Sequence, residues 1–154
     1  MKIPKTTMFD YLKWRGDLSF SADPVNEVDS LIFSTLSYID FIMVPFVNTL
    51  NPRVAPTMAE VSKILNENAQ GDKKFLDLLK KCARTNRFKK VEVFGYESII
   101  TEDDELLQFA AVSFMTESGI VIAFRGTDDS FVGWGEDLKM SFARVPSQDY
   151  ALDY

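Results

Sequence analysis

Apolar residues in the first half of the chain recur at the three- and four-residue spacing of amphipathic helices. A short helix is expected over Thr7 to Trp14, closed by Gly16. A second is expected to open at Asp23-Pro24, with aspartate as N-cap and proline at the first helical position. Its apolar stripe consists of Val25, Val28, Leu31, Ile32, Leu36 and Ile39.

Two further helices are predicted before the pattern changes. Thr57 begins a capping box and Asp72 caps the helix after it. Residues 41–56 contain three prolines and two asparagines, which predicts irregular backbone there. Residues 1–88 are therefore interpreted as helical.

Residues 89–126 are interpreted as strand-rich. Strands are expected over 91–100 and 106–115, and a tight reversal at 117–119 leads into a third at 120–124. The third is apolar at every position, which is typical of a strand covered on both faces. Three strands joined by short turns predict an antiparallel meander.

The last part of the chain predicts two more helices. An amphipathic crossover helix is expected over 133–142, and residues 147–154 open another with Ser147 as N-cap. That last helix has about two turns, too few to be stable without docking. We therefore expect one incomplete domain of the α/β class spanning residues 1–154.

Composition excludes several chemistries. The chain has no histidine, so Ser-His-Asp and Cys-His catalysis cannot operate within it, and no G-x-S-x-G occurs. Cys82 is the only cysteine, so an internal disulfide and a four-cysteine zinc site are excluded. A buried, inert thiol is expected there. No metal and no cofactor is predicted.

Charge and hydropathy indicate which partners and which cellular location to expect. The net charge of -6 argues against nucleic-acid binding. Residues 1–14 contain no signal-like apolar run, and the apolar window 31–50 is broken by Asp40 and Pro45, which argues against a membrane span. We expect a cytoplasmic protein.

Basic residues are concentrated between positions 73 and 90. They are Lys73, Lys74, Lys80, Lys81, Arg84, Arg87, Lys89 and Lys90. A solvated helix face is the preferred interpretation, and a patch that binds an anionic lipid surface is the alternative.

The residues that could form a reactive site follow the third strand. Arg125-Gly126-Thr127 follows the apolar run directly, at the sheet edge where α/β folds bind ligands. Gly126 allows a turn and close approach of the backbone, and Thr127 adds a hydroxyl donor, so together they could stabilise an oxyanion.

A buried strand ending in Phe124-Arg125-Gly126-Thr127, with Trp134 and Asp137 in a later W-x-x-D, resembles the lipase class-3 branch of the α/β-hydrolases. The segments Tyr11-Leu12-Lys13-Trp14-Arg15-Gly16-Asp17 and Asn26-Glu27-Val28-Asp29 are similar to an uncharacterised bacterial group of lipase-like hydrolases.

The resemblance implies an ester or lipid substrate and assigns Thr127 to the oxyanion hole. It implies that Trp134 and Asp137 organise the helix and loop beside the site. The serine, aspartate and histidine of that family would follow residue 154, so the chain as given lacks the catalytic triad and is expected to be inactive.

Alternatives remain open at these positions. Arg125 could pair with Asp128 or Asp137, and Gly126 could serve only as a strand-ending turn. Asp128, Asp129, Glu136 and Asp137 do not have the spacing of a calcium-binding EF-hand loop, and no carboxylate pair of a glycosidase is singled out. A second function is a non-catalytic interaction module that self-associates through an unpaired strand.

Overall fold

The computed structural model of the chain describes residues 6–68, 72–101, 107–126 and 146–154. Its centre is a sheet formed by β1 (Glu92–Thr101), β2 (Leu107–Thr116) and β3 (Gly119–Phe124). The helices around it are α1 (Met8–Arg15), α2 (Glu27–Leu36), α3 (Met58–Asn68), α4 (Lys73–Cys82) and α6 (Pro146–Asp153). The fold is mixed α/β, as the sequence predicts.

The predicted antiparallel meander is confirmed. The strands lie in the order β1-β2-β3, and the two-residue turn after β2 sets Thr116 opposite Gly119. A bulge interrupts the β1–β2 pairing between Phe94 and Glu97, where Gly95 has a φ of 63°. A positive φ favours glycine because it has no Cβ.

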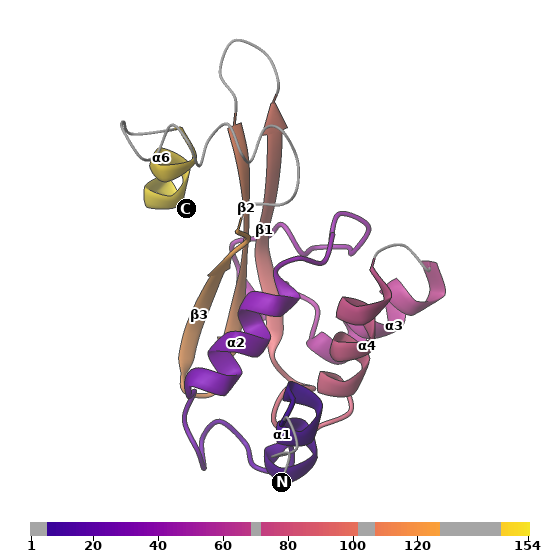
Figure 1. The fold of residues 1–154 in the computed structure, drawn as a ribbon. Coiled ribbons are helices and arrows are strands. Elements are labelled where there is room, and N and C mark those ends of the chain that lie inside the picture. Colours follow the sequence, from indigo (N-terminus) through magenta and orange to yellow (C-terminus); the bar gives the residue numbers. More distant parts are fainter. Residues whose placement is uncertain (1–5, 69–71, 102–106, 127–145) are drawn as a thin grey trace, which may run out of the picture.

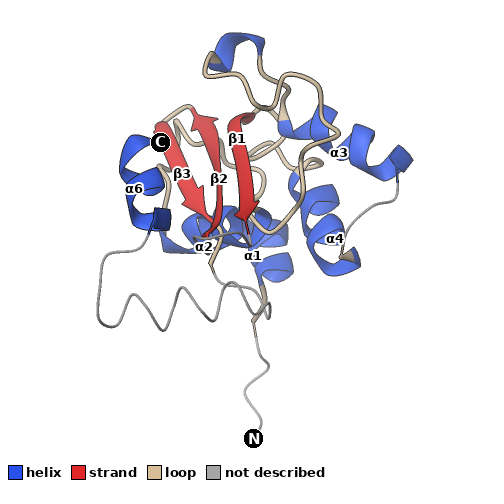
Figure 2. Cartoon of the chain, turned by 90° about the horizontal axis from the view of Figure 1, so that it is seen from above, coloured by secondary structure: helices blue, strands red, loops and turns tan. Residues whose placement is uncertain are grey.

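Helices cover the two faces of the sheet unequally. Figure 1 shows α2 lying across the sheet, where Phe33 packs against Phe114 of β2 with ring centroids 4.7 Å apart. In Figure 2, α3 and α4 lie beside β1, whereas α6 lies at the opposite side of the sheet. α6 packs against Phe109 and Ala111, which point away from the main core.

The prediction that the third strand is covered on both faces is wrong for the described residues. Val121 and Ala123 face the main core, but Ile120, Ile122 and Phe124 on the other face are 55%, 49% and 44% exposed. Among the described residues β3 is an edge strand, and its Phe124 ring meets the ring of Tyr154, the residue that follows α6, at a centroid distance of 6.0 Å.

Most predicted helix starts are confirmed by their caps. The side-chain oxygen of Thr57 accepts a hydrogen bond from the Glu60 amide, and the Glu60 carboxylate accepts one from the Thr57 amide. Asp72 caps α4 by accepting from the Lys74 amide. Residues 41–56 are irregular apart from a single 3-10 turn at Pro52–Val54.

The predicted start of the second helix at Asp23-Pro24 is wrong. α2 begins at Glu27, after Asn26, whose side chain accepts from the amides of Val28 and Asp29. The reason is tertiary: the carbonyls of Asp23 and Pro24 accept hydrogen bonds from Arg87, so they are not available to a helix.

Of the two helices expected near the carboxyl end, one lies within the described residues and one does not. The helix expected from Ser147 is present, but it begins at Pro146, so Ser147 lies in its first turn and the prediction that it is the N-cap is wrong. The crossover helix expected over 133–142 lies outside the described residues. Within the part of the chain that is described, no helix is long and apolar enough to cross a bilayer.

Arg87 was predicted to belong to a solvated basic face, but it is buried. It is 2% exposed and forms an ion pair with Asp29, which is 0% exposed. Tyr11 donates its hydroxyl to the same carboxylate at 2.9 Å. We call Tyr11, Asp29 and Arg87 the buried triplet. Because Tyr11 and Asp29 belong to segments that carry the bacterial resemblance, those segments have a structural role here.

Candidate functional site

The chain leaves β3 through Arg125 and Gly126 at the carboxyl end of the strand. The Arg125 amide donates to the Ala110 carbonyl at 2.8 Å, so the pairing with β2 extends one residue beyond the strand. Gly126 follows at an exposed position. This is the strand-to-glycine arrangement that the sequence predicts at a sheet edge.

Gly126 lies against the end of a tyrosine side chain. A Cβ placed on it would lie 2.9 Å from the hydroxyl oxygen of Tyr38, closer than Cβ atoms normally approach other atoms. The Tyr38 ring is stacked on Phe75, with centroids 5.5 Å apart and planes inclined by 21°. A close contact is therefore present at this glycine, but it is made to the Tyr38 side chain, and the expected approach of a ligand to the Gly126 backbone stays a prediction.

Tyr96 of β1 and Asp40 form a polar contact close to the same strand end. The Tyr96 hydroxyl donates to Asp40 Oδ1 at 3.0 Å, and the Ile42 amide donates to the same oxygen at 3.0 Å. The Tyr96 ring is buried, whereas Asp40 is exposed. Asp40 is thus held in one orientation by two donors while it still meets water.

Arg125 lies near enough to Tyr96 to act on its ionisation. Burial raises the pKa of Tyr96 above its ordinary value, the Ser98 hydroxyl opposes that shift, Asp40 adds to it and the Arg125 cation opposes it. We call Tyr96, Asp40 and Arg125 the strand-end triplet. Within the described residues Arg125 forms no ion pair, so the proposed pairing with Asp128 or Asp137 stays a prediction.

The predicted site residues are only partly placed. Arg125 and Gly126 lie together at the end of β3. Thr127, Trp134 and Asp137 lie outside the described residues, as do Asp128, Asp129 and Glu136 of the metal alternative. The oxyanion assignment of Thr127 therefore stays a prediction.

Sequence reasoning missed Tyr38, Asp40 and Tyr96. In the sequence, Asp40 is only an interruption of an apolar window, and Tyr96 is one aromatic residue of a predicted strand. Asp40 and Tyr96 are 56 positions apart in the chain. No local pattern connects them, because only the packing of the 41–50 segment against β1 brings them together.

Other reactive groups in the described residues are few. Cys82 is fully buried, and burial raises the pKa of its thiol, so it stays protonated at neutral pH. This agrees with the predicted inert thiol, because the thiolate is the nucleophilic form. Among the described residues, no group of three or more histidine, cysteine and acidic side chains could hold a metal ion.

Comparison with known proteins gives one similarity. Residues 82–154, which include the whole sheet together with Arg125 and Gly126, match the model of a family described as Mbeg1-like. Neither the curated proteins nor the solved structures contain a match to the chain.

Proposed function

We propose that this chain is the N-terminal part of a lipase-like serine hydrolase domain, and that the turn after β3 supplies donors to its oxyanion hole. The observation that carries the proposal is the tight approach of Gly126 to Tyr38 at the end of a strand. The missing Cβ makes room for the Tyr38 hydroxyl, and Gly126 itself is exposed, so a substrate can reach its backbone. The resemblance around Arg125-Gly126-Thr127 supports the same interpretation.

The chemistry assigned to this part is electrostatic. In acyl transfer, negative charge develops on the carbonyl oxygen, and preorganised N–H and O–H donors stabilise it. Thr127 would offer its amide and its hydroxyl. The nucleophile and its base would come from residues after Tyr154, because the 154 residues contain no histidine and no G-x-S-x-G. The substrate class is an ester or a lipid.

The first test is to read the native gene past the codon for Tyr154. A continuing frame with a further strand, a G-x-S-x-G and a later histidine is expected. The whole protein should then react with a fluorophosphonate, whereas the 154-residue chain should not. A stop codon at that position, or a whole protein that is inert to the reagent, would count against the proposal.

A variant of the whole protein tests the role of Thr127. Thr127→Val removes the hydroxyl and is expected to lower kcat for a short-chain ester about a hundredfold, with little change in KM. Thr35→Val is the control, since its hydroxyl bonds to the Leu31 carbonyl inside α2. Equal activities for the two variants would remove the Thr127 hydroxyl from the oxyanion hole and leave only its amide as a donor.

A second candidate function is an interaction module that associates through β3. The observation that favours it is that no described strand pairs with the outer edge of β3. Pairing alternates along a strand, and the Arg125 amide points to β2, so the amides of Ile120, Ile122 and Phe124 point away from it. Gly119–Phe124 contains no charge and no proline, the usual protections of an edge.

Sedimentation velocity over a wide concentration range tests this second candidate. The chain is expected to sediment faster as its concentration rises, and Ile122→Lys is expected to restore a monomer. Ile42→Lys is a matched control, because Ile42 is 73% exposed and lies outside the strand. A wild-type chain that stays monomeric throughout would rule out association through β3.

A further inference from the structure

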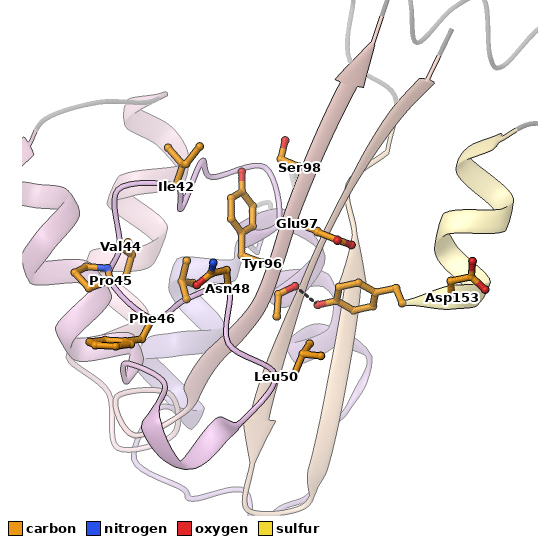
Figure 3. Close-up of a pocket in the computed structure, with 13 residues that line it drawn as sticks. Ile42, Val44, Pro45, Phe46, Asn48, Leu50, Tyr96, Glu97, Ser98 and Asp153 are labelled. Carbon is orange, nitrogen blue, oxygen red and sulfur yellow. Dashed lines mark hydrogen bonds between the residues drawn. The ribbon is translucent and has the colours of Figure 1, made fainter. Parts of the chain in front are cut away.

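A cleft lies beside β1, between the 42–50 segment and the end of α6 (Figure 3). Its volume is about 740 Å³, within the range of roughly 300–1,000 Å³ that small-molecule sites occupy. Gly95 and Tyr154 line it, and the Tyr154 hydroxyl donates to the Gly95 carbonyl at 2.6 Å. The end of α6 is therefore tied to the sheet at this cleft.

The wall formed by the 42–50 segment is apolar and faces water. Ile42, Phe46 and Leu50 are 73%, 69% and 82% exposed. Exposed apolar side chains are common singly, but here they are gathered along one concave surface. An apolar body in the cleft would remove them from water, which is favourable.

This wall is preorganised. Val44 and Val47 are buried between the exposed residues and anchor the segment in the core. The carbonyls of Val47 and Thr49 accept hydrogen bonds from the amides of Tyr96 and Gly95, at 2.9 and 2.8 Å. The apolar side chains thus stand on backbone that is fixed to β1, so little ordering would be needed on binding.

Phe46 adds an independent observation. Its φ is 62°, in the left-handed region that bulky residues rarely adopt. Such residues persist where their surroundings fix them, and they are concentrated at binding sites. The Phe46 carbonyl accepts from the Thr49 amide at 3.2 Å, so the turn that holds this conformation is closed.

The charge of the cleft selects the ligand. Glu97 of β1 and Asp153 of α6 line it, and both side chains are exposed. In Figure 3 the Glu97 side chain extends from β1 toward α6 and Asp153 lies on α6, whereas Ile42 and Phe46 lie on the other side of the view. Among the described residues no lysine or arginine lines the cleft, and neither carboxylate forms an ion pair. The one described cation that acts on a lining residue is Arg125, which opposes the raised pKa of Tyr96. Anions are repelled from such a site and cations are attracted.

We propose that this cleft binds a small amphipathic cation. Its apolar body would pack against Ile42, Phe46 and Leu50, and its amine or quaternary ammonium would lie at Glu97 and Asp153. This binding uses neither Gly126 nor Thr127, so it stands whether or not the chain belongs to a hydrolase. It assigns a ligand class to a surface that the hydrolase proposal leaves unused.

Calorimetric titration of the chain with two probes of equal tail length tests the charge preference. Decyltrimethylammonium, kept below its micelle concentration, is expected to bind saturably and about tenfold more tightly than decyl sulfate. Glu97→Gln should abolish most of that preference. Glu27→Gln removes the same charge at an exposed position of α2 and should leave the preference unchanged.

The apolar wall is tested separately. Leu50→Ser is expected to weaken the binding of decyltrimethylammonium about tenfold, because it removes a large apolar contact. Leu31→Ser is the control, since Leu31 is 55% exposed on α2 and does not line the cleft. Unsaturable binding, equal affinity for the two probes, or equal effects of a variant and its control would overturn the proposal.

Discussion

The buried triplet and the strand-end triplet contain the same three side-chain types, and only the buried triplet is closed. Each has a tyrosine hydroxyl that donates to an aspartate, at 2.9 Å in the buried triplet and 3.0 Å in the strand-end triplet. In the buried triplet the arginine forms an ion pair with that aspartate, whereas in the strand-end triplet it does not. The same chemistry is thus used once for structure and once at an accessible strand end.

In the buried triplet, every polar side-chain group has a hydrogen-bond partner. Arg87 donates to both oxygens of Asp29 and also to backbone carbonyls between positions 18 and 24. Its guanidinium also lies over the Phe20 ring, 4.2 Å from the centroid. A charge that is paired and hydrogen-bonded in this way tolerates burial. Its role is therefore to hold the segment between α1 and α2 against the core.

The strand-end triplet has hydrogen-bond donors and acceptors that are not all used within the described part of the protein. Asp40 accepts from Tyr96 and from a backbone amide, but it is exposed, and Arg125 is only half-buried. Groups with unused donors and acceptors beside a strand end can meet a ligand, whereas fully satisfied groups cannot. The comparison therefore supports function at the strand end and argues against it at the buried triplet.

The largest effect is expected from removing the cation of the buried triplet. Arg87→Met leaves Asp29 buried without its partner, which should lower the free energy of unfolding by about 3–5 kcal/mol. Urea denaturation followed by circular dichroism measures the loss. Arg15→Met is the control, because Arg15 pairs with Asp23 at 2.9 Å in an exposed position and should cost about 1 kcal/mol or less. Similar losses for the two variants would mean that burial does not distinguish these ion pairs.

A smaller effect is expected at the glycines next to the two triplets. Gly16 accepts from the Arg87 amide, and a Cβ on it would lie 2.3 Å from the Leu12 carbonyl oxygen and 2.7 Å from Thr85. Backbone cannot move aside easily, so Gly16→Ala should cost about 1–3 kcal/mol of unfolding free energy. Gly126→Ala should cost less, because its obstacle is the end of the half-exposed Tyr38 side chain.

Urea midpoints of the two alanine variants measure this difference. Adding Tyr38→Phe removes the oxygen that the new Cβ would meet, so the double variant with Gly126→Ala should match Tyr38→Phe alone. A larger loss at Gly126 than at Gly16 would show that the strand end is as tightly closed as the buried triplet.

Local structure could be predicted at most places where its cause is local. The caps at Thr57 and Asp72 and the meander turn at Glu117–Ser118 depend on residues within four positions of one another, and all three were predicted. The start of α2 was not, although Asn26 and Asp29 form a local capping box there. Arg87, more than sixty positions from Asp23, takes the carbonyls of Asp23 and Pro24, and no local pattern indicates that contact.

The candidate site shows the same limit. Gly126 could be found because a strand and a turn adjoin in the sequence, whereas Tyr38 reaches it only through tertiary packing. The apolar pattern of β3 likewise predicted a covered strand, because composition records what a side chain prefers and not whether a neighbour is present. Ile120 and Ile122 are both apolar, yet both are about half exposed.

The smallest effect is expected on thermal stability at alkaline pH, where Tyr11 and Tyr96 can be compared. Burial raises the pKa of both Tyr11 and Tyr96 above the ordinary value of about 10. A phenol with a raised pKa in the folded state contributes stability below pH 10, and that contribution is lost as the pH rises through the folded-state pKa. The wild-type chain should therefore lose thermal stability in this range.

Tyr96→Phe should remove part of that alkaline loss and change the melting temperature at neutral pH only slightly, because Asp40 is exposed and water can replace the lost donor. Tyr11→Phe should lower the melting temperature at neutral pH as well, because Asp29 loses a donor where water cannot enter. Melting curves at neutral and alkaline pH compare the two variants. Equal losses at neutral pH would mean that the strand-end triplet is sealed from water, and the argument for an accessible site there would fail.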